Sequence, residues 1–155
     1  MNKKFKRSIA PLERLLRQLR ATPPVRVDAL PPGIPTAGVY VFSERGRDLY
    51  VGRTNRMRAR LQEHCRASST SNSAPFAFTL ARNAPGLRRT TYLPDASRRQ
   101  LDQDPKFNAA FTRAKQRVRR MYVRFVREAD PTRQALLELY VAIELETPYN
   151  DFDNH

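Results

Sequence analysis

The sequence predicts an α+β protein, and three stretches carry that prediction. Residues 37–43 and 48–52 are short runs rich in β-branched and aromatic side chains, separated by a turn that contains Gly46. Such a pair is typical of a β-hairpin, in which glycine supplies any positive φ that the turn needs. Residues 118–126 alternate apolar with polar side chains, which predicts a third strand with an arginine-bearing face. Most other segments show apolar residues at helical spacing, so we expect helices around a small sheet.

The chain is strongly basic, and this narrows the expected partners. It carries 29 Lys and Arg against 15 Asp and Glu in 155 residues, a formal net charge of +14. Such a surplus attracts polyanions, which makes nucleic acid the first expectation and an anionic membrane surface the alternative. No apolar run is long enough to span a bilayer, and no secretory signal is visible near the N-terminus. The single cysteine, Cys65, excludes an internal disulfide, which agrees with a reducing cytoplasm. One cysteine and two histidines are too few ligands for a zinc finger.

Two segments precede the predicted hairpin. Residues 1–7 are basic and expected to be frayed, and Ser8 is predicted to cap a helix that ends near Arg20, so that residues 1–21 form a basic N-terminal helical segment. Its leucines make an apolar stripe, by which the helix either packs on the domain or, in addition, lays its arginines on phosphates. Residues 22–36 contain five prolines, which predicts a stiff, extended connector.

Helices are expected through the rest of the chain. Thr54 or Asn55 is predicted to cap a helix ending near Cys65. Residues 75–82 read as a short helix, residues 83–94 as irregular, and residues 95–115 as one or two helices broken near Asp104. Asp130 is expected to cap the last helix, with proline at its first position and its end near residue 146.

Several side chains could carry chemistry, and each also has an ordinary explanation. Residues 135–143 are apolar nearly all round, which predicts a buried helix, and Glu138 lies within it. A buried carboxylate must pair with a basic side chain or bind a cation, and both alternatives stay open. Tyr40 and Tyr50 would ordinarily be packing residues, and Asn150 a turn or cap residue. The remaining pair, Arg60 and His64, is four residues apart on one helix face that could equally be solvated or in contact with substrate.

Taken together, these residues resemble the GIY-YIG nuclease family. The two family motifs correspond to Gly38-Val39-Tyr40 and Tyr50-Val51-Gly52, with valine in place of isoleucine in both. The family arginine matches Arg60, eight residues after Gly52, and a histidine found in several branches matches His64. A metal-binding glutamate on a later helix matches Glu138, and an asparagine twelve residues on matches Asn150. The resemblance covers about residues 37–64 and 117–150.

The resemblance implies a central three-stranded mixed or antiparallel sheet flanked by helices, with residues 37–155 as the nuclease domain. The distance from His64 to Glu138 is longer than in compact members, so residues 68–116 read as a helical insertion that would influence substrate choice. The N-terminal helix is also outside the shared core.

The activity that the resemblance implies is metal-dependent endonucleolytic hydrolysis of DNA. Glu138 would hold one Mg²⁺ or Mn²⁺, and Arg60 would neutralise charge on the phosphate. Tyr40 is the family choice as general base, with a pKa lowered by nearby positive charge, and His64 competes for that role. Tyr50 would position phosphate or water. Asn150 would fix the end of the last helix.

Substrate contacts and alternatives complete the expectations. Arg53, Arg56, Arg58 and Arg124 are predicted to bind nucleic acid. The alternatives are a non-catalytic nucleic-acid-binding protein on a nuclease scaffold, and a structure-specific or RNA nuclease, because charge alone does not separate DNA from RNA. One site cuts one strand, so double-strand cleavage would need a homodimer or rebinding. We expect the protein to act in a prokaryotic or phage-infected cell. By analogy with the family branches that share Arg60 and His64, a role in restriction or in a mobile element is the first expectation.

Overall fold

A computed structural model describes residues 1–85 and 98–152, which divide into two compact units. The first unit joins residues 1–60 to the chain from Met121 onward, and the second unit comprises residues 61–120. The division falls inside helix α3 (Met57–Glu63), directly after Arg60. Within the described ranges, every helix is too short or too polar to cross a lipid bilayer.

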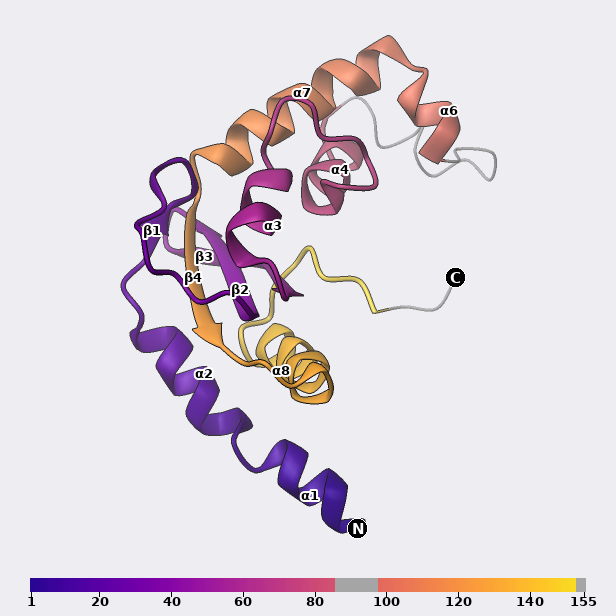
Figure 1. Cartoon of the computed structure of the whole chain (residues 1–155). Coiled ribbons are helices and arrows are strands. Elements are labelled where there is room, and N and C mark those ends of the chain that lie inside the picture. The colour runs from indigo at the N-terminus through magenta and orange to yellow at the C-terminus, as the bar shows by residue number, and fades with distance from the viewer. Residues whose placement is uncertain (86–97, 153–155) are drawn as a thin grey trace. The chain divides into compact units, whose positions relative to one another are not determined.

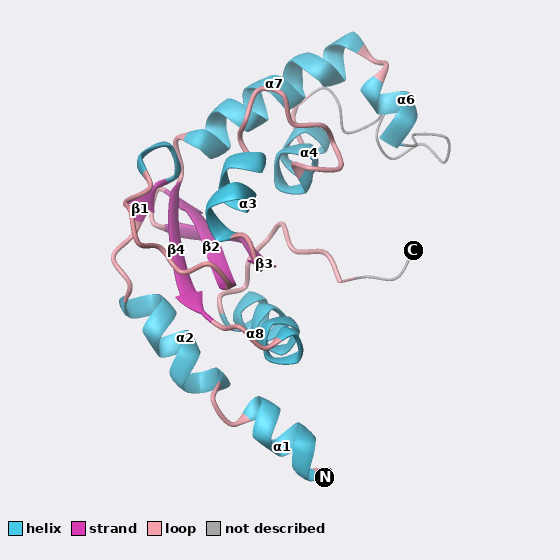
Figure 2. Ribbon diagram, in the orientation of Figure 1, coloured by secondary structure: helices cyan, strands magenta, loops and turns pink. Residues whose placement is uncertain are grey.

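The first unit is built on a four-stranded antiparallel sheet with the order β1-β4-β2-β3 (Figures 1 and 2). Its strands are β1 (Val25–Arg26), β2 (Gly38–Glu44), β3 (Arg47–Thr54) and β4 (Tyr122–Arg127). The α+β prediction is confirmed, but the expected three strands are four. The additional strand β1 lies in the proline-rich segment, where residues 25–26 pair with β4 and a 3-10 helix (Val27–Ala29) follows. Residues 25–26 are extended, as expected of this segment, but their pairing with the sheet and the 3-10 helix after them were not predicted.

The β2–β3 hairpin closes through a two-residue turn. Arg45 and Gly46 have φ values of 52° and 76°, and Glu44 pairs with Arg47 across them. Two positive φ values in succession twist the chain in the sense that a tight hairpin needs. The register shifts between Phe42 and Ser43, so the sheet bulges one residue before Tyr50.

Two helices cover the sheet and form the core of the first unit. Helix α2 (Leu12–Ala21) packs by its leucine stripe against α8 (Pro131–Glu144) and the sheet. As predicted, Asp130 caps α8 by accepting a hydrogen bond from the Arg133 N–H (2.8 Å), and proline occupies the first position. The expectation that α8 is buried all round is wrong, because Leu139 and Ile143 are 41% and 62% exposed. The core consists of Leu12, Leu15, Leu16, Leu19, Val39, Val41, Val51, Val126, Leu137, Val141 and Ala142.

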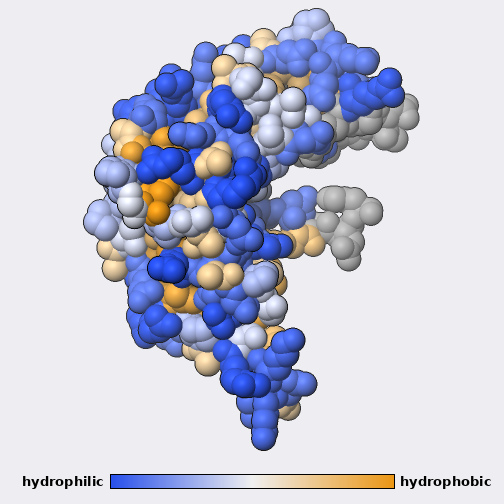
Figure 3. All heavy atoms as spheres, viewed as in Figure 1, coloured by the Kyte–Doolittle hydropathy of each residue, from blue (hydrophilic) through white to orange (hydrophobic). Residues whose placement is uncertain are grey.

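The N-terminus differs from the prediction. Residues expected to be frayed form helix α1 (Lys3–Ile9), which Asn2 caps through a hydrogen bond from the Lys4 N–H (2.7 Å). Ser8 does not cap a helix, since its hydroxyl donates to the Lys4 carbonyl oxygen. None of the α1 residues is buried, and its surface in Figure 3 is almost wholly hydrophilic.

The second unit is helical, with α4 (Pro75–Arg82), α6 (Arg98–Asp102) and α7 (Pro105–Arg119). The predicted helix at 75–82 and the predicted break near Asp104 are confirmed, and most of the segment predicted to be irregular lies outside the described residues. The strand predicted from residue 118 begins only at Tyr122, because the fully buried Val118 continues the apolar face of α7. Phe107 is the centre of this unit: its ring meets Phe78 at 5.3 Å and Phe111 at 6.2 Å between centroids.

Candidate active site

Tyr40 lies across the hairpin from Gly52, and the two residues require one another. They are register partners in the β2–β3 pair, and Tyr40 is 1% exposed. A Cβ atom on Gly52 would lie 2.2 Å from the Tyr40 hydroxyl oxygen and 2.3 Å from its Cζ. Gly52 therefore makes room for the tyrosine side chain, which folds over the bare backbone of the neighbouring strand.

Gly38 meets a comparable constraint on the other side of β2. A Cβ atom there would lie 1.9 Å from the Val126 carbonyl oxygen, which belongs to the backbone of β4. Both motif glycines thus permit close approach inside the sheet, at backbone conformations that any residue could adopt. Both glycines belong to the motifs visible in the sequence, but their steric role becomes visible only in the structure.

Tyr50 lies on the same face of the hairpin as Tyr40 but is only partly buried. It pairs with Phe42, and their rings stack with centroids 6.4 Å apart. Phe42 also meets Tyr40 edge-on at 5.5 Å. This aromatic row holds both phenol rings in place.

Arg60 joins the two tyrosines to helix α3. Its guanidinium is hydrogen-bonded to the Tyr40 hydroxyl, and its charge also acts on Tyr50. Burial nevertheless dominates both groups: it raises the pKa of Tyr40 well above its ordinary value and that of Tyr50 to about 12, against the opposing effect of Arg60. Arg60 does lower the Tyr40 pKa, as predicted, but burial outweighs this effect and the net shift is upward. Both phenols are protonated at neutral pH and act as hydrogen-bonding groups.

Glu138 faces the same cluster from α8, and Arg53 pairs with it. The Arg53 Nε donates to the Glu138 Oε2 at 3.0 Å, with side-chain exposures of 45% and 26%. Burial raises the pKa of the Glu138 carboxyl, and Arg53 only partly offsets this. Of the two explanations left open by the sequence, the structure shows the pairing with a basic side chain. Because the pair is half-exposed, it is weak and readily exchanged for another cation.

Asn150 binds the free edge of β3, next to Tyr50. Its amide Nδ2 donates to the Val51 carbonyl oxygen and its Oδ1 accepts from the Val51 N–H, both at 2.8 Å. The Thr147 hydroxyl also donates to this Oδ1 (2.8 Å), and the Tyr149 N–H donates to the Leu49 carbonyl (3.2 Å). The side chain thus imitates a further strand and ties the segment after α8 to the strand that carries Tyr50.

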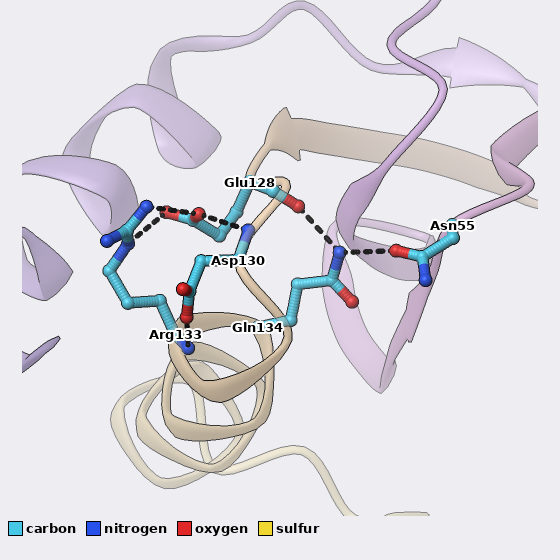
Figure 4. A network of polar contacts seen from close by, with 5 residues as sticks. All are labelled: Asn55, Glu128, Asp130, Arg133 and Gln134. Carbon is cyan, nitrogen blue, oxygen red and sulfur yellow. Dashed lines mark hydrogen bonds and ion pairs between the residues drawn. The ribbon is translucent and has the colours of Figure 1, made fainter.

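A polar network around the buried Gln134, which the sequence did not predict, fixes the start of α3 (Figure 4). Gln134, 2% exposed and one turn before Glu138 on α8, donates to the Asn55 Oδ1 at 2.8 Å and to the Glu128 carbonyl at 2.6 Å. The Glu128 carboxylate in turn accepts two hydrogen bonds from Arg133, each at 3.0 Å. Gln134 therefore links the helix that carries Glu138 to the turn that leads into the helix of Arg60. The available signal in the sequence was the position of Gln134 directly before the apolar stretch 135–143.

The four arginines predicted to bind nucleic acid differ in their surroundings. Arg53 pairs with Glu138, and Arg124 pairs with Asp48 in a largely buried contact, which makes it a structural residue rather than a phosphate contact. Arg58 donates to the Pro31 carbonyl oxygen. Arg56 and Arg58 are both exposed and line a hollow of about 240 Å³ beside Gly33 and Thr36.

His64 belongs to the second unit, and its side chain is fully buried. Full burial keeps the imidazole from solvent in this structure. Its catalytic role stays a prediction, and the residues that the structure brings together are Tyr40, Tyr50, Arg60 and Glu138, with Arg53 beside them.

A divalent cation at this cluster would have few protein ligands and would keep most of its bound water. Among residues 1–85 and 98–152, no three His, Cys, Asp or Glu side chains gather as a ligand set. Mg²⁺ commonly binds proteins through one or two carboxylates and keeps several waters, so Glu138 alone suffices as the protein ligand once Arg53 moves aside.

Comparisons with known proteins add no relative, since no family model, curated protein or solved structure matches this chain.

Proposed function

We propose that this protein is a metal-dependent endonuclease of the GIY-YIG type that hydrolyses phosphodiester bonds of DNA. One observation carries the proposal: the hydroxyls of Tyr40 and Tyr50, on the two strands of the hairpin, are both within electrostatic reach of Arg60 on α3 and Glu138 on α8, in a single unit. Packing alone does not require an arginine, a carboxylate and two phenols at one point. The net charge of +14 supplies the attraction for a polyanionic substrate.

Each residue has a distinct part in the proposed reaction. Arg60 presents a planar guanidinium that neutralises charge on the non-bridging oxygens of the scissile phosphate. The Tyr40 hydroxyl is hydrogen-bonded to Arg60 and holds it in place, and the Tyr50 hydroxyl orients phosphate or water. Glu138 would hold Mg²⁺ or Mn²⁺, a cation that stabilises the leaving oxygen and lowers the pKa of bound water.

Arg53 then has a role beyond that expected from the sequence. Without a cation it partly neutralises Glu138, which is otherwise desolvated. When a cation takes its place at the carboxylate, Arg53 becomes available to the substrate phosphates. It therefore acts first as the partner of the metal ligand.

A second candidate is a nucleic-acid-binding protein without catalysis. The Arg53–Glu138 pair favours it, because a carboxylate satisfied by arginine needs no metal. The raised pKa of Tyr40 also leaves this phenol a poor base.

Nicking of supercoiled plasmid separates the two candidates. Wild type and Glu138→Ala are incubated at low salt with Mg²⁺, Mn²⁺ or EDTA, and retardation of the plasmid is measured in parallel. The nuclease proposal predicts metal-dependent nicking that Glu138→Ala loses while retardation is kept. Retardation by wild type without nicking in either metal would select the binding protein, and nicking that Glu138→Ala retains would overturn the assignment of the metal ligand.

A further inference from the structure

Helix α7 carries a concentration of positive charge that the proposed active site does not use. The stretch from residue 105 to 120 contains six basic residues and no acidic one. Five of the six are exposed, and the sixth, Lys115, is buried with its Nζ donating to the carbonyls of Ala67 (2.7 Å) and Ser69 (2.9 Å). The unit to which α7 belongs, residues 61–120, holds 12 Lys and Arg against 4 Asp and Glu, more than half of the chain's net charge.

Four of these exposed residues fall in one line along the helix: Lys106, Arg113, Arg117 and Arg120. At about 100° per residue they lie within a sector of roughly 60°. The buried side of α7, marked by Phe107 and Val118, points elsewhere. The line is about 21 Å long at 1.5 Å per residue, and we refer to these four residues as the cationic stripe.

Three of the four stripe residues are not neutralised by neighbouring carboxylates. Among the residues that the structure describes, no ion pair joins Lys106, Arg113 or Arg120 to an acidic side chain. By contrast, Arg53 and Arg124 of the first unit each have a carboxylate partner. Holding exposed like charges together without counter-charges is unfavourable for folding, which points to a polyanion as their partner.

We infer that the cationic stripe binds the phosphate backbone of duplex DNA. This choice of DNA rests on the proposed function. Phosphates of one strand advance by about 3.4 Å per nucleotide along the helix axis, so a line of about 21 Å covers roughly six of them. Long arginine side chains adapt to such a row, and their contacts supply affinity and orientation without reading sequence.

The stripe gives the second unit a function of its own. The active-site cluster acts on one phosphate, whereas the stripe holds the backbone over several nucleotides. Most of the salt-dependent affinity of the protein then comes from α7, and Arg56 and Arg58 contribute a smaller part.

The test measures binding without cleavage. A triple variant, Arg113→Gln with Arg117→Gln and Arg120→Gln, is compared with wild type by fluorescence anisotropy on a 30-bp duplex in EDTA, across a salt series. Lys3→Gln with Lys4→Gln and Lys6→Gln is the matched control, because it removes the same charge from the exposed helix α1. Arg→Lys changes at the three α7 positions form a second variant that keeps the charge.

The expected results follow from counterion release. Loss of three phosphate contacts lowers the magnitude of the slope of log K against log salt by about 2.7, and affinity at 0.1 M salt falls on the order of 100-fold. The α1 control should change the slope by less than about 1, and the Arg→Lys variant should restore it. Equal slopes for the α7 variant and the α1 control would overturn the inference. A loss of affinity in the α7 variant that is seen on an RNA duplex of the same length, but not on the DNA duplex, would also overturn it.

The outcome is separable from that of the proposed function. If wild type binds DNA through α7 but never nicks plasmid, the cationic stripe is supported as a DNA-binding surface and the nuclease proposal is rejected. If wild type nicks plasmid in a metal-dependent way and the α7 variant has the same salt slope as wild type, DNA binding by the stripe is rejected and the nuclease proposal is supported.

Discussion

Replacing Gly52 by alanine should destabilise the protein and displace Tyr40 from the proposed site. In a strand with ordinary φ, alanine would by itself stabilise by about 0.5–1 kcal/mol relative to glycine. Here the added Cβ would stand 2.2 Å from the Tyr40 hydroxyl oxygen, where an ordinary contact needs about 3.5 Å or more. The ring must therefore move by more than 1 Å, although it is 1% exposed and lies edge-on to Phe42.

The magnitude has two parts. Overpacking of a buried site typically costs about 1–3 kcal/mol. Displacement of the phenol also breaks its hydrogen bond with Arg60, worth about 1.5–3 kcal/mol for a charged partner and less where solvent replaces it. We expect the free energy of unfolding to fall by about 2–4 kcal/mol, a change that a domain of ordinary stability survives.

Urea unfolding of single and double variants measures the effect. Tyr40→Leu shortens the side chain that meets the new methyl group, so Gly52→Ala combined with Tyr40→Leu should be less destabilised than the sum by at least about 1 kcal/mol. Tyr40→Phe should give no such relief, since the Cζ atom at 2.3 Å remains. Gly46→Ala is the control: no atom lies within 4 Å of its Cβ position, and its effect should add to that of Tyr40→Leu within about 0.5 kcal/mol. A Gly52→Ala protein as stable as wild type would show that the Tyr40 ring does not lie over Gly52 in solution.

Three further predictions concern the residues around the cluster. Burial raises the folded-state pKa of the Glu138 carboxyl, so the protein loses stability as pH rises from about 4.3, the unfolded value, through the folded pKa. In urea unfolding, Glu138→Gln should therefore be more stable than wild type at pH 7 and equal to it below about pH 4. A variant less stable than wild type at pH 7 would contradict this. Gln134→Leu removes the hydrogen bond to Asn55 and should lower kcat with KM and salt slope little changed, whereas a purely structural role would lower only the unfolding free energy. Asn150→Ala removes both hydrogen bonds to Val51, and hydrogen exchange of the Val51 amide should accelerate at least tenfold; unchanged protection would show that the edge contact does not form in solution.

What the sequence predicted correctly depends on near neighbours. The Asp130 cap and the break near Asp104 were predicted, and in both places an aspartate is followed directly by the proline that begins the helix. The hairpin turn at Gly46 is equally local. Such features are visible in a short window because the interacting groups lie within a few residues.

What it missed depends on partners far along the chain. Residues 25–26 form a strand only because β4 lies beside them, almost a hundred residues later. Arg124 looked like a surface cation until Asp48 proved to be its partner. The pKa of Tyr40 is set by burial, which no spacing of charges in the sequence reveals.

The central claim is that Arg60 and its neighbours hydrolyse phosphodiester bonds. Single-turnover nicking of plasmid in Mg²⁺ by wild type, Arg60→Gln and Arg56→Gln tests it most directly, because the two arginines are one helical turn apart and carry equal charge. If Arg60 neutralises the scissile phosphate, wild type should nick in a metal-dependent way, Arg60→Gln should lose on the order of 10²–10³-fold in rate, and Arg56→Gln should keep a near-normal rate constant with weaker binding. Equal rate constants for the two variants, or no nicking by wild type in any divalent metal, would contradict it.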